Sequence, residues 1–284
     1  KGKSLPLSIK GELKGERFEV PGNISSQYIT GLMFAIVAMK KDAVIYITEN
    51  IESAPYIDIT VNVLRSFGFT IDKKNEREYH ISAKRSEAPD TYNVEGDFSN
   101  GAFWLCAAAI NKNNHPFICK GLNFTSEQGD KKIVDILSAF GTKVDVFNNN
   151  ISVKYNALQA VNIDATSIPD LVPVLSVVAS VSEGKTVISN TKRLRIKESD
   201  RVLSTVTMIK NLGGIIDYDD NNIYITGSKL LKGGTVNSFN DHRIVISATI
   251  ASFICENEVK IIGAEAVNKS YPDFFDKFYE FTKE

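Results

Sequence analysis

The densest group of charged side chains in this chain is the segment 192–201, which includes Lys197, Glu198 and Arg201. A strand is expected to end here and a helix to begin, and a helix N-terminus favours anions. Arginine can hold two oxygens of a phosphate or carboxylate at once. The pattern therefore indicates an anion site. The alternative is a solvated, charged connection in which Asp200 merely caps the helix.

Other expected helix starts carry side chains that also suit anion or proton chemistry. Arg243 and Lys269 lie at expected helix starts, where a cation is unfavourable because it opposes the helix dipole. A bound anion would offset this unfavourable interaction. Asp170 precedes an otherwise apolar helix, as a helix-start charge or as a general base. The polar triplet 25–27 could cap a helix or hold an anion, and capping explains only one of its two serines.

The elements that position these residues follow a repeat of about 72 residues. Tyr79, Ile151 and Ile223 are equally spaced (151 − 79 = 72 and 223 − 151 = 72). A shared period indicates one structural unit copied, each copy burying its apolar face against the next. Four copies are expected, the last cut short, each reading helix, strand, helix, strand, strand.

Each copy is expected to begin with a buried helix, because the segments 28–37, 102–110, 171–181 and 244–254 are apolar nearly all round. The second helices are expected to be capped by aspartate and to end at glycine. These positions are Asp58, Asp130, Asp200 and Asp273 for the caps and Gly68, Gly141 and Gly213 for the ends. A hairpin follows, and one more short strand, at Val20, Val94, Ile163 or Val236, leads into the next buried helix. Residues 5–10 form an expected orphan strand, the tail of a lost copy.

Composition excludes several classes of protein. Among 284 residues, 43% are hydrophobic and 24% charged, with a formal net charge of −1, which argues against general nucleic-acid binding. No apolar run reaches the roughly 20 residues needed to span a bilayer. Three cysteines in apolar runs indicate free thiols in a reducing cytoplasm. His80 and His115 lack partners at metal-ligand spacing, so no metal site is expected.

Six motifs, in this order, make the chain resemble the 5-enolpyruvylshikimate-3-phosphate synthase (EPSP synthase) family. They are GNISSQ (22–27), SAPYID (53–58), IPD (168–170), LRIKESDR (194–201), NDHR (240–243) and KSYPD (269–273). The resemblance covers essentially the whole chain. It implies an α/β (α+β) fold of βαβαββ units, with buried helices inside and sheets outside.

The resemblance also implies a division into domains. Residues 1–95 would be the C-terminal part of the family's first domain, and 96–284 the second domain of three repeats. The family's N-terminal third is absent. That third carries further phosphate-binding motifs, so the chain by itself is expected to be inactive. The intact protein would be a cytoplasmic monomer.

The family's activity is transfer of the enolpyruvyl group of phosphoenolpyruvate to the 5-hydroxyl of shikimate 3-phosphate, without metal or organic cofactor. Residues implied to bind shikimate 3-phosphate are Ser25, Ser26, Gln27, Ser53, Tyr56, Asp170 and Lys197. Those implied to bind phosphoenolpyruvate are Gln27, Arg201, His242, Arg243 and Lys269. Asp170 and Lys197 would contact the attacking hydroxyl, and Glu198 would act in proton transfer at the methylene carbon.

Two other readings stay open. The sister enzyme that transfers enolpyruvyl to UDP-N-acetylglucosamine shares this fold, although the motifs at 25–27 and 195–201 argue against it. Alternatively, the chain is a non-catalytic repeat or binding module. Small-molecule substrates are the only partners expected for the enzyme, with no nucleic acid and no membrane.

Overall fold

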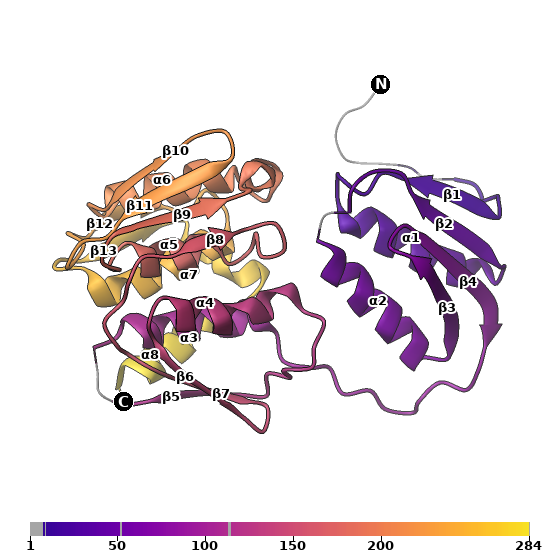
Figure 1. The fold of residues 1–284 in the computed structure, drawn as a ribbon, viewed down its shortest axis with the longest axis horizontal. Helices are drawn as coiled ribbons and strands as arrows, with labels where there is room; N and C mark the ends of the chain where they lie inside the picture. The colour runs from indigo at the N-terminus through magenta and orange to yellow at the C-terminus, as the bar shows by residue number, and fades with distance from the viewer. Residues whose placement is uncertain (1–7, 9, 52, 113–114, 284) are drawn as a thin grey trace. The chain divides into compact units, whose positions relative to one another are not determined.

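The computed structural model describes residues 8, 10–51, 53–112 and 115–283. The chain divides into two compact units, Lys1–Asn93 and Val94–Glu284. Figure 1 shows the first in indigo to purple and the second in magenta to yellow. The expected domain boundary at residue 95 lies two residues beyond this division.

Unit 1 is a four-stranded sheet with two helices. The strand order is β1-β2-β4-β3, with β1 parallel to β2 and the other neighbours antiparallel. Its elements are β1 (Arg17–Val20), α1 (Ser26–Met39), β2 (Ala43–Ile47), α2 (Ala54–Ser66), β3 (Phe69–Asn75) and β4 (Glu78–Arg85). Alternate strand residues such as Ile45 and Ile81 pack with Ile29, Met33 and Ile57 of the helices to form the core. Both helices therefore cover one face of the sheet (Figure 1).

The first apolar helix is only partly buried, which corrects the expectation from its sequence. Ile29, Met33 and Ile36 of α1 are buried, but Tyr28 is 57% exposed and Phe34 is 50% exposed. The buried residues are three and four positions apart and so lie on one side of the helix. The other side is open within unit 1.

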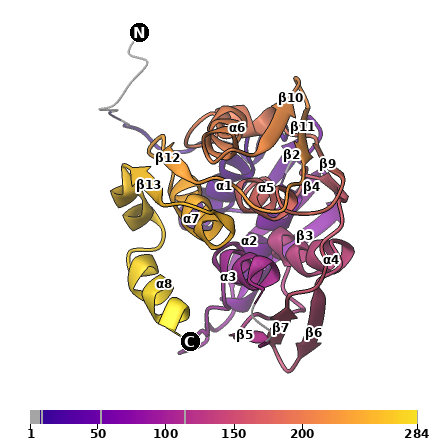
Figure 2. The same ribbon diagram turned by 90° about the vertical axis from the view of Figure 1, so that its left-hand side faces the viewer.

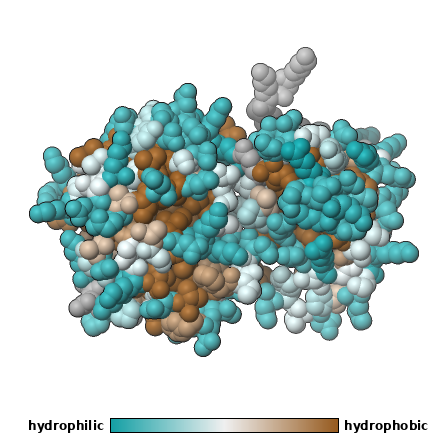
Figure 3. All heavy atoms as spheres, viewed as in Figure 1, coloured by the Kyte–Doolittle hydropathy of each residue, from teal (hydrophilic) through white to brown (hydrophobic). Residues whose placement is uncertain are grey.

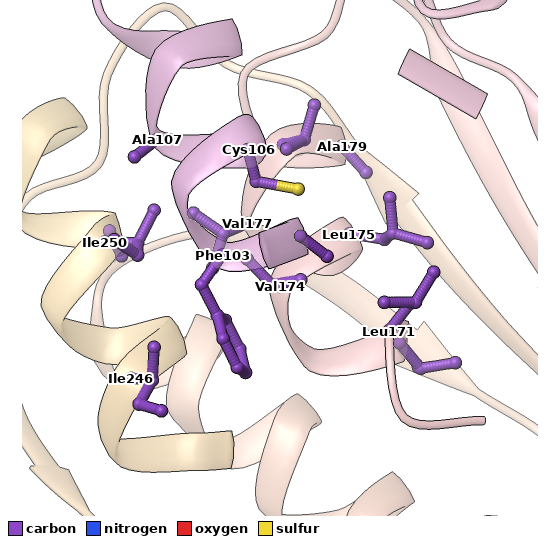
Figure 4. Packing of buried hydrophobic residues seen from close by; sticks show 14 of the residues in the cluster. Phe103, Cys106, Ala107, Leu171, Val174, Leu175, Val177, Ala179, Ile246 and Ile250 are labelled. Carbon is purple, nitrogen blue, oxygen red and sulfur yellow. The ribbon is translucent and has the colours of Figure 1, made fainter. Parts of the chain in front are cut away.

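Unit 2 is built around three inner helices, α3 (Phe98–Ile110), α5 (Val172–Ala179) and α7 (His242–Ala251). Every residue of α5 and α7 is buried, as the apolar sequences predict. In Figure 4, Phe103 and Cys106 of α3 and Val174 of α5 meet in this core, with Ile246 and Ile250 of α7 beside them. The inner helices therefore form the centre of the unit, and their first turns belong to its buried interior.

Sheets and outer helices surround this centre (Figures 1 and 2). The sheets have the orders β5-β7-β6, β10-β11-β9-β8 and β12-β13. Their strands are β5 (Phe117–Lys120), β6 (Lys143–Phe147), β7 (Asn150–Lys154), β8 (Asn162–Asp164), β9 (Lys185–Ser189), β10 (Ile215–Tyr218), β11 (Asn222–Thr226), β12 (Gly234–Asn237) and β13 (Val259–Ile262). The outer helices are α4 (Ile133–Ala139), α6 (Arg201–Asn211) and α8 (Phe274–Lys283). The helices-inside, sheets-outside arrangement expected from the sequence is confirmed.

The predicted aspartate cap is confirmed at one helix and wrong at two. Asp200 caps α6 and accepts a hydrogen bond from the backbone N–H of Leu203 at 3.0 Å. Asp58 lies inside α2, because that helix already begins at Ala54 after Ser53. Asp130 lies in η1, a 3₁₀ turn (Gly129–Lys132) that precedes α4. The aspartates of these three copies, Asp58, Asp130 and Asp200, therefore have different roles.

The glycines that end the second helices have the left-handed conformation expected of a C-terminal cap. Gly68, Gly141 and Gly213 have φ values of +86°, +98° and +85°. The hairpins that follow also form, as β3–β4, β6–β7 and β10–β11.

Three of the four short strands before the inner helices are present, and one is absent. Val20, Ile163 and Val236 lie in β1, β8 and β12, each paired in parallel with the next strand of its repeat. Val94 is in no strand and is 86% exposed. Among the described residues β5, the counterpart of β2 and β9, pairs only with β7, so its outer edge carries no parallel strand. The expected orphan strand at 5–10 lies largely outside the described residues.

An aromatic cluster attaches the C-terminal helix to unit 2. The Nε1–H of Trp104 in α3 donates to the hydroxyl of Tyr271 at 3.2 Å. The Trp104 ring also lies 5.5 Å, centroid to centroid, from the rings of Phe274 and Phe281. Phe253 packs against Phe281 from η3 (Ser252–Ile254). The helix α8 is therefore held mainly by apolar contact.

The surface is mixed in polarity, and the cysteines form no disulfide among the described residues. The face drawn in Figure 3 is mainly hydrophilic, with a band of hydrophobic residues on unit 2. Among the helices that the structure describes, none combines the length and the apolar character that crossing a membrane requires. Cys106, Cys119 and Cys255 are free thiols, and Cys106 is fully buried.

Candidate functional site

A network of ion pairs in unit 2 joins residues that the sequence places far apart. It lies where α5, α6 and α7 begin. The network includes six of the site residues that the sequence predicted, namely Asp170, Lys197, Glu198, Arg201, His242 and Arg243. The predicted residues of unit 2 are thus brought together, with Lys269 at the edge.

Asp170 is the centre of this network. Its Oδ1 accepts from Nη1 of Arg201 at 2.5 Å, and its Oδ2 accepts from Nη2 of Arg243 at 3.2 Å. The Nζ of Lys197 is 4.0 Å from Oδ1. Burial by itself raises the pKa of this carboxyl, but Arg243, Arg201 and Lys197 outweigh burial and lower the pKa to about 2. Asp170 is therefore ionised at neutral pH.

The local fold leaves Asp170 available for this role. The backbone turns at 168–171, where the N–H of Leu171 donates to the carbonyl of Ile168 at 3.0 Å. The helix α5 begins only after Leu171, and no side chain caps it. Pro173 follows in the first turn, a position where a missing N–H costs no helical hydrogen bond. The carboxylate of Asp170 faces the arginines instead of capping the helix.

Arg201 is held in place by a second carboxylate, that of Asp241. Its Nε donates to Oδ2 of Asp241 at 2.8 Å, and its Nη2 lies 3.3 Å from Oδ1. Arg201 is 2% exposed and Asp241 is fully buried. A cation in the first residue of α6 opposes the helix dipole, so these carboxylates offset an unfavourable position.

Asp241 also organises the start of α7. It accepts from the backbone N–H of Arg243 at 3.0 Å and from Oγ of Ser199 at 3.0 Å. The sequence motif contained Asp241, but sequence reasoning did not select it as a site residue. A signal was present, since an aspartate before an apolar helix that begins with two basic residues can both cap the helix and pair with a cation.

Glu198 and His242 form a pair suited to proton transfer. Oε2 of Glu198 is 3.1 Å from Nδ1 of His242, and its Oε1 is 3.6 Å from Nη2 of Arg201. Burial lowers the pKa of His242, and Arg243 adds to this, while Glu198 partly opposes both. The imidazole is therefore neutral at pH 7. Its Nε2 is buried and has no hydrogen-bond partner among the described residues.

Lys197 is a second candidate for proton chemistry. Burial lowers the pKa of its ammonium, and Arg193, Arg201 and Arg243 lower it further against the opposing effect of Asp170. A lysine in such surroundings gives up its proton more readily than a solvated one. Its ammonium is therefore an electrostatic partner of Asp170 that holds its proton less tightly than a solvated lysine does.

Lys269 is connected to the network by a hydrogen bond to a backbone carbonyl. It ends η4 (Ala264–Lys269), and its Nζ donates to the carbonyl of Asn240 at 2.5 Å. This bond places the ammonium beside the loop that leads into His242 and Arg243. Lys269 is exposed, unlike Arg243, which is 9% exposed.

The remaining predicted residues belong to unit 1 and lie at its two helix starts. Ser25 caps α1, accepting from the N–H of Gln27 at 3.2 Å, while Ser26 is buried and Gln27 is exposed. Ser53 precedes α2 in the left-handed conformation (φ +55°), and Tyr56 is 37% exposed in the first turn. One of the two serines is thus a cap, as expected, and the other is not.

Comparison with known proteins identifies the family. The sequence model described as EPSP synthase (3-phosphoshikimate 1-carboxyvinyltransferase) matches residues 1–278. The chain belongs to the EPSP synthase family. Its relatives include the 3-phosphoshikimate 1-carboxyvinyltransferases of Clostridium acetobutylicum, 47% identical over 96% of this chain, and Clostridium novyi, 41% identical over 96%. The match spans 63% and 62% of those relatives, so the chain covers less than two thirds of their length.

Solved structures agree on the fold of this EPSP synthase family member. The EPSP synthase of Acinetobacter baumannii is similar with a TM-score of 0.80 at 24% identity, covering 93% of this chain and 61% of that one. The enolpyruvyl transferase NikO of Streptomyces tendae is similar with a TM-score of 0.69 at 16% identity, covering 93% and 63%. At these identities the likeness establishes the α/β enolpyruvyl transferase fold.

Proposed function

We propose that the protein to which this chain belongs transfers the enolpyruvyl group of phosphoenolpyruvate to the 5-hydroxyl of shikimate 3-phosphate. The observation that carries the proposal is the Asp170 network. It holds three cations, Lys197, Arg201 and Arg243, directly beside the Glu198–His242 pair. The names of the curated relatives support the same reaction.

The reaction needs a base, an acid and several fixed cations. In the addition step, the 5-hydroxyl oxygen forms a bond to C2 of phosphoenolpyruvate, its proton leaves, and the methylene carbon gains a proton. In the elimination step, that carbon loses a proton and the C2–O bond to phosphate breaks. Proton transfers of this kind are accelerated by groups whose pKa values are tuned by burial and neighbouring charge.

The described residues can be assigned to these steps. Asp170 and Lys197 would contact the hydroxyl, and Glu198 would move the proton at the methylene carbon. Arg201, Arg243 and Lys269 would hold the phosphate and carboxylate of phosphoenolpyruvate, with His242 beside them. A bound anion would accept a hydrogen bond from Arg243 Nε, which is buried and has no partner among the described residues.

The residues at the helix starts of unit 1 would bind shikimate 3-phosphate. Ser25, Ser26, Gln27, Ser53 and Tyr56 offer hydroxyl and amide groups, and the N-termini of α1 and α2 favour a phosphate. We further propose that the protein acts as a cytoplasmic monomer. Three free thiols favour a reducing compartment.

Phosphate release from phosphoenolpyruvate tests the proposal. The 284-residue chain and the intact protein are each incubated with phosphoenolpyruvate and either shikimate 3-phosphate or UDP-N-acetylglucosamine. We expect release only by the intact protein and only with shikimate 3-phosphate. Release with UDP-N-acetylglucosamine instead would assign the sister activity, and no release with either acceptor would leave a binding module.

A further inference from the structure

The link 197–200, between η2 (Lys192–Ile196) and α6, carries the side chains of Lys197 and Glu198. The backbone of residues 197–199 makes no hydrogen bond to another described residue, so side-chain contacts must fix its position. Glu198 needs this support most, because its side chain is 39% exposed whereas that of its partner His242 is 6% exposed. An exposed glutamate loses rotamer freedom when it is held in a single contact.

The hydroxyl of Ser199 connects this link to the start of α7. Its Oγ is 3.0 Å from Oδ2 of Asp241 and 3.1 Å from Oγ of Ser204. Burial raises the pKa of Asp241, but Arg201 outweighs burial and lowers it, so the carboxylate is ionised and can only accept. Ser199 therefore donates its single proton to Asp241, and Ser204 donates to Ser199.

The Ser199–Asp241 hydrogen bond lies next to the contact between Glu198 and His242. Both contacts join the same two segments, and they are one residue apart in each segment. A bond at one position limits the movement of the link at the next. Asp241 is a rigid anchor for this purpose, because it is fully buried and accepts from Nε of Arg201 at 2.8 Å.

We propose that Ser199 is a positioning residue, whose hydrogen bond to Asp241 holds Glu198 in contact with His242. Ser199 does not touch the reacting atoms and acts only through the link. The alternative is that its hydroxyl satisfies the buried Asp241 carboxylate and contributes to stability alone. The catalytic consequence rests on the proposed role of Glu198 in proton transfer, whereas the positioning itself can be measured without substrate.

The titration of His242 distinguishes the two readings. Burial lowers the pKa of His242 and Arg243 lowers it further, while Glu198 and Asp241 raise it. If Ser199→Ala lets the Glu198 carboxylate move away, its raising effect weakens and the pKa of His242 falls. A purely stabilising hydroxyl would leave the imaging of this charge at the imidazole unchanged, so the pKa of His242 would stay at its native value.

The pKa is measured by an NMR titration of the histidine Cε1–H signals in the 284-residue chain. The chain has three histidines, so His80 and His115 serve as internal references. We expect Ser199→Ala to lower the pKa of His242 and Ser199→Thr, which keeps the hydroxyl, to leave it at the native value. The alanine variant should fold, because Asp241 keeps its hydrogen bonds from Arg201.

Ser189→Ala is the matched control. Ser189 is a half-buried serine of the same unit, and its Oγ donates to the carbonyl of Ile163 at 3.2 Å, away from the link. This variant loses a comparable hydrogen bond and should keep the native pKa of His242. A native pKa in Ser199→Ala, or an equal fall in Ser189→Ala, would overturn the positioning role.

Turnover of the intact protein tests the catalytic consequence. Ser199→Ala should lower kcat for phosphate release roughly 10-fold, the effect of losing a hydrogen bond to a charged group, and Ser199→Thr should restore it. The KM for phosphoenolpyruvate should not change, because the cations remain. A rise in KM with native kcat would overturn the inference. A lowered pKa of His242 with native kcat would confirm the positioning and remove the Glu198–His242 pair from the proposed reaction.

Discussion

Asp170 and Asp241 occupy the same position in successive repeats (241 − 170 = 71), yet only Asp241 caps its helix. Asp97, one repeat earlier, also caps its helix, accepting from the N–H of Ser99 at 2.8 Å. At Asp170 the helix starts later, so the carboxylate turns to Arg201 and Arg243 instead. The aspartate at this position therefore caps a helix in two copies, whereas in the copy between them it is the centre of an ion-pair network.

Replacing Asp170 with Asn should destabilise unit 2 most at neutral pH. The pKa of Asp170 is lowered from 3.8 to about 2, so its charge stabilises the fold above pH 3.8 and loses that effect as the pH falls through 2. Loss of the charge should cost about 2–3 kcal/mol at pH 7. Chemical denaturation measures the difference from the native chain, and we expect it to be roughly halved at pH 3. A cost independent of pH would mean that packing, not charge, accounts for the effect.

In the intact protein, Glu198→Gln should lower turnover by about 10²–10⁴-fold, the usual effect of losing a general acid or base. Phosphoenolpyruvate should still bind, because the arginines remain. Steady-state phosphate release and a separate binding titration distinguish the two steps. Glu183→Gln, an exposed glutamate of the same unit, is the control. Unchanged turnover would remove Glu198 from its assigned role.

Arg243→Ala should weaken phosphoenolpyruvate binding before it affects the chemical step. Charge-assisted hydrogen bonds are worth about 1.5–3 kcal/mol each, which corresponds to roughly 10–150-fold in affinity. Because Arg243 also pairs with Asp170, the folded fraction must be checked by circular dichroism. A rise in KM that accompanies unchanged kcat is the expected signature. A fall in kcat with unchanged KM would instead place Arg243 in the transition state alone.

The three thiols should differ in reactivity. Burial raises the pKa of Cys255 to about 11, raises that of Cys119, and raises that of the fully buried Cys106 strongly. At pH 8 we expect Cys255 to react with iodoacetamide about 100-fold more slowly than an ordinary thiol, since only the thiolate reacts. Peptide mass mapping before and after denaturation measures this. Rapid labelling of Cys106 in the folded chain would contradict its burial.

Asp130→Asn should stabilise the chain in a pH-dependent way. Because the folded-state pKa is about 6 against 3.8 unfolded, ionisation of Asp130 costs stability once the pH rises through this interval. The variant should therefore gain about 2 kcal/mol more at pH 8 than at pH 4. Urea denaturation at both values tests this, with Asp135→Asn as the reference. An equal change at both values would show that Asp130 has an ordinary pKa.

The sequence predicts most of the fold because the repeated apolar segments correspond to helices that pack in the core. Inner helices such as α5 and α7 are apolar all round, and both are fully buried. An apolar sequence does not predict the burial of α1, where Tyr28 and Phe34 are exposed. The sequence indicates that an apolar helix face favours burial, but it does not show whether another element covers that face. The strand expected at Val94 is also wrong: β5, which would be its parallel neighbour, is present at the edge of its sheet, yet the described residues around Val94 form no strand beside it.

The site was less predictable than the fold. Cations at helix starts indicated Arg201 and Arg243, because their positions are unfavourable without a counter-charge. The identity of that counter-charge depends on where α5 begins, and helix boundaries are the least certain part of a sequence reading. The role of Asp241 comes from its contact with Arg201, 40 residues away in sequence, which a local pattern does not contain.

The aromatic cluster around Trp104 makes the two units spectroscopically distinguishable. Trp104 is the single tryptophan of the chain, and it lies in unit 2 against α8. Its emission therefore reports the unfolding of unit 2 and the release of α8, while unit 1 melts without a tryptophan signal. Circular dichroism records the helices of both units. The separation between the two melting curves thus measures, without any label, how far the units fold as independent thermodynamic bodies.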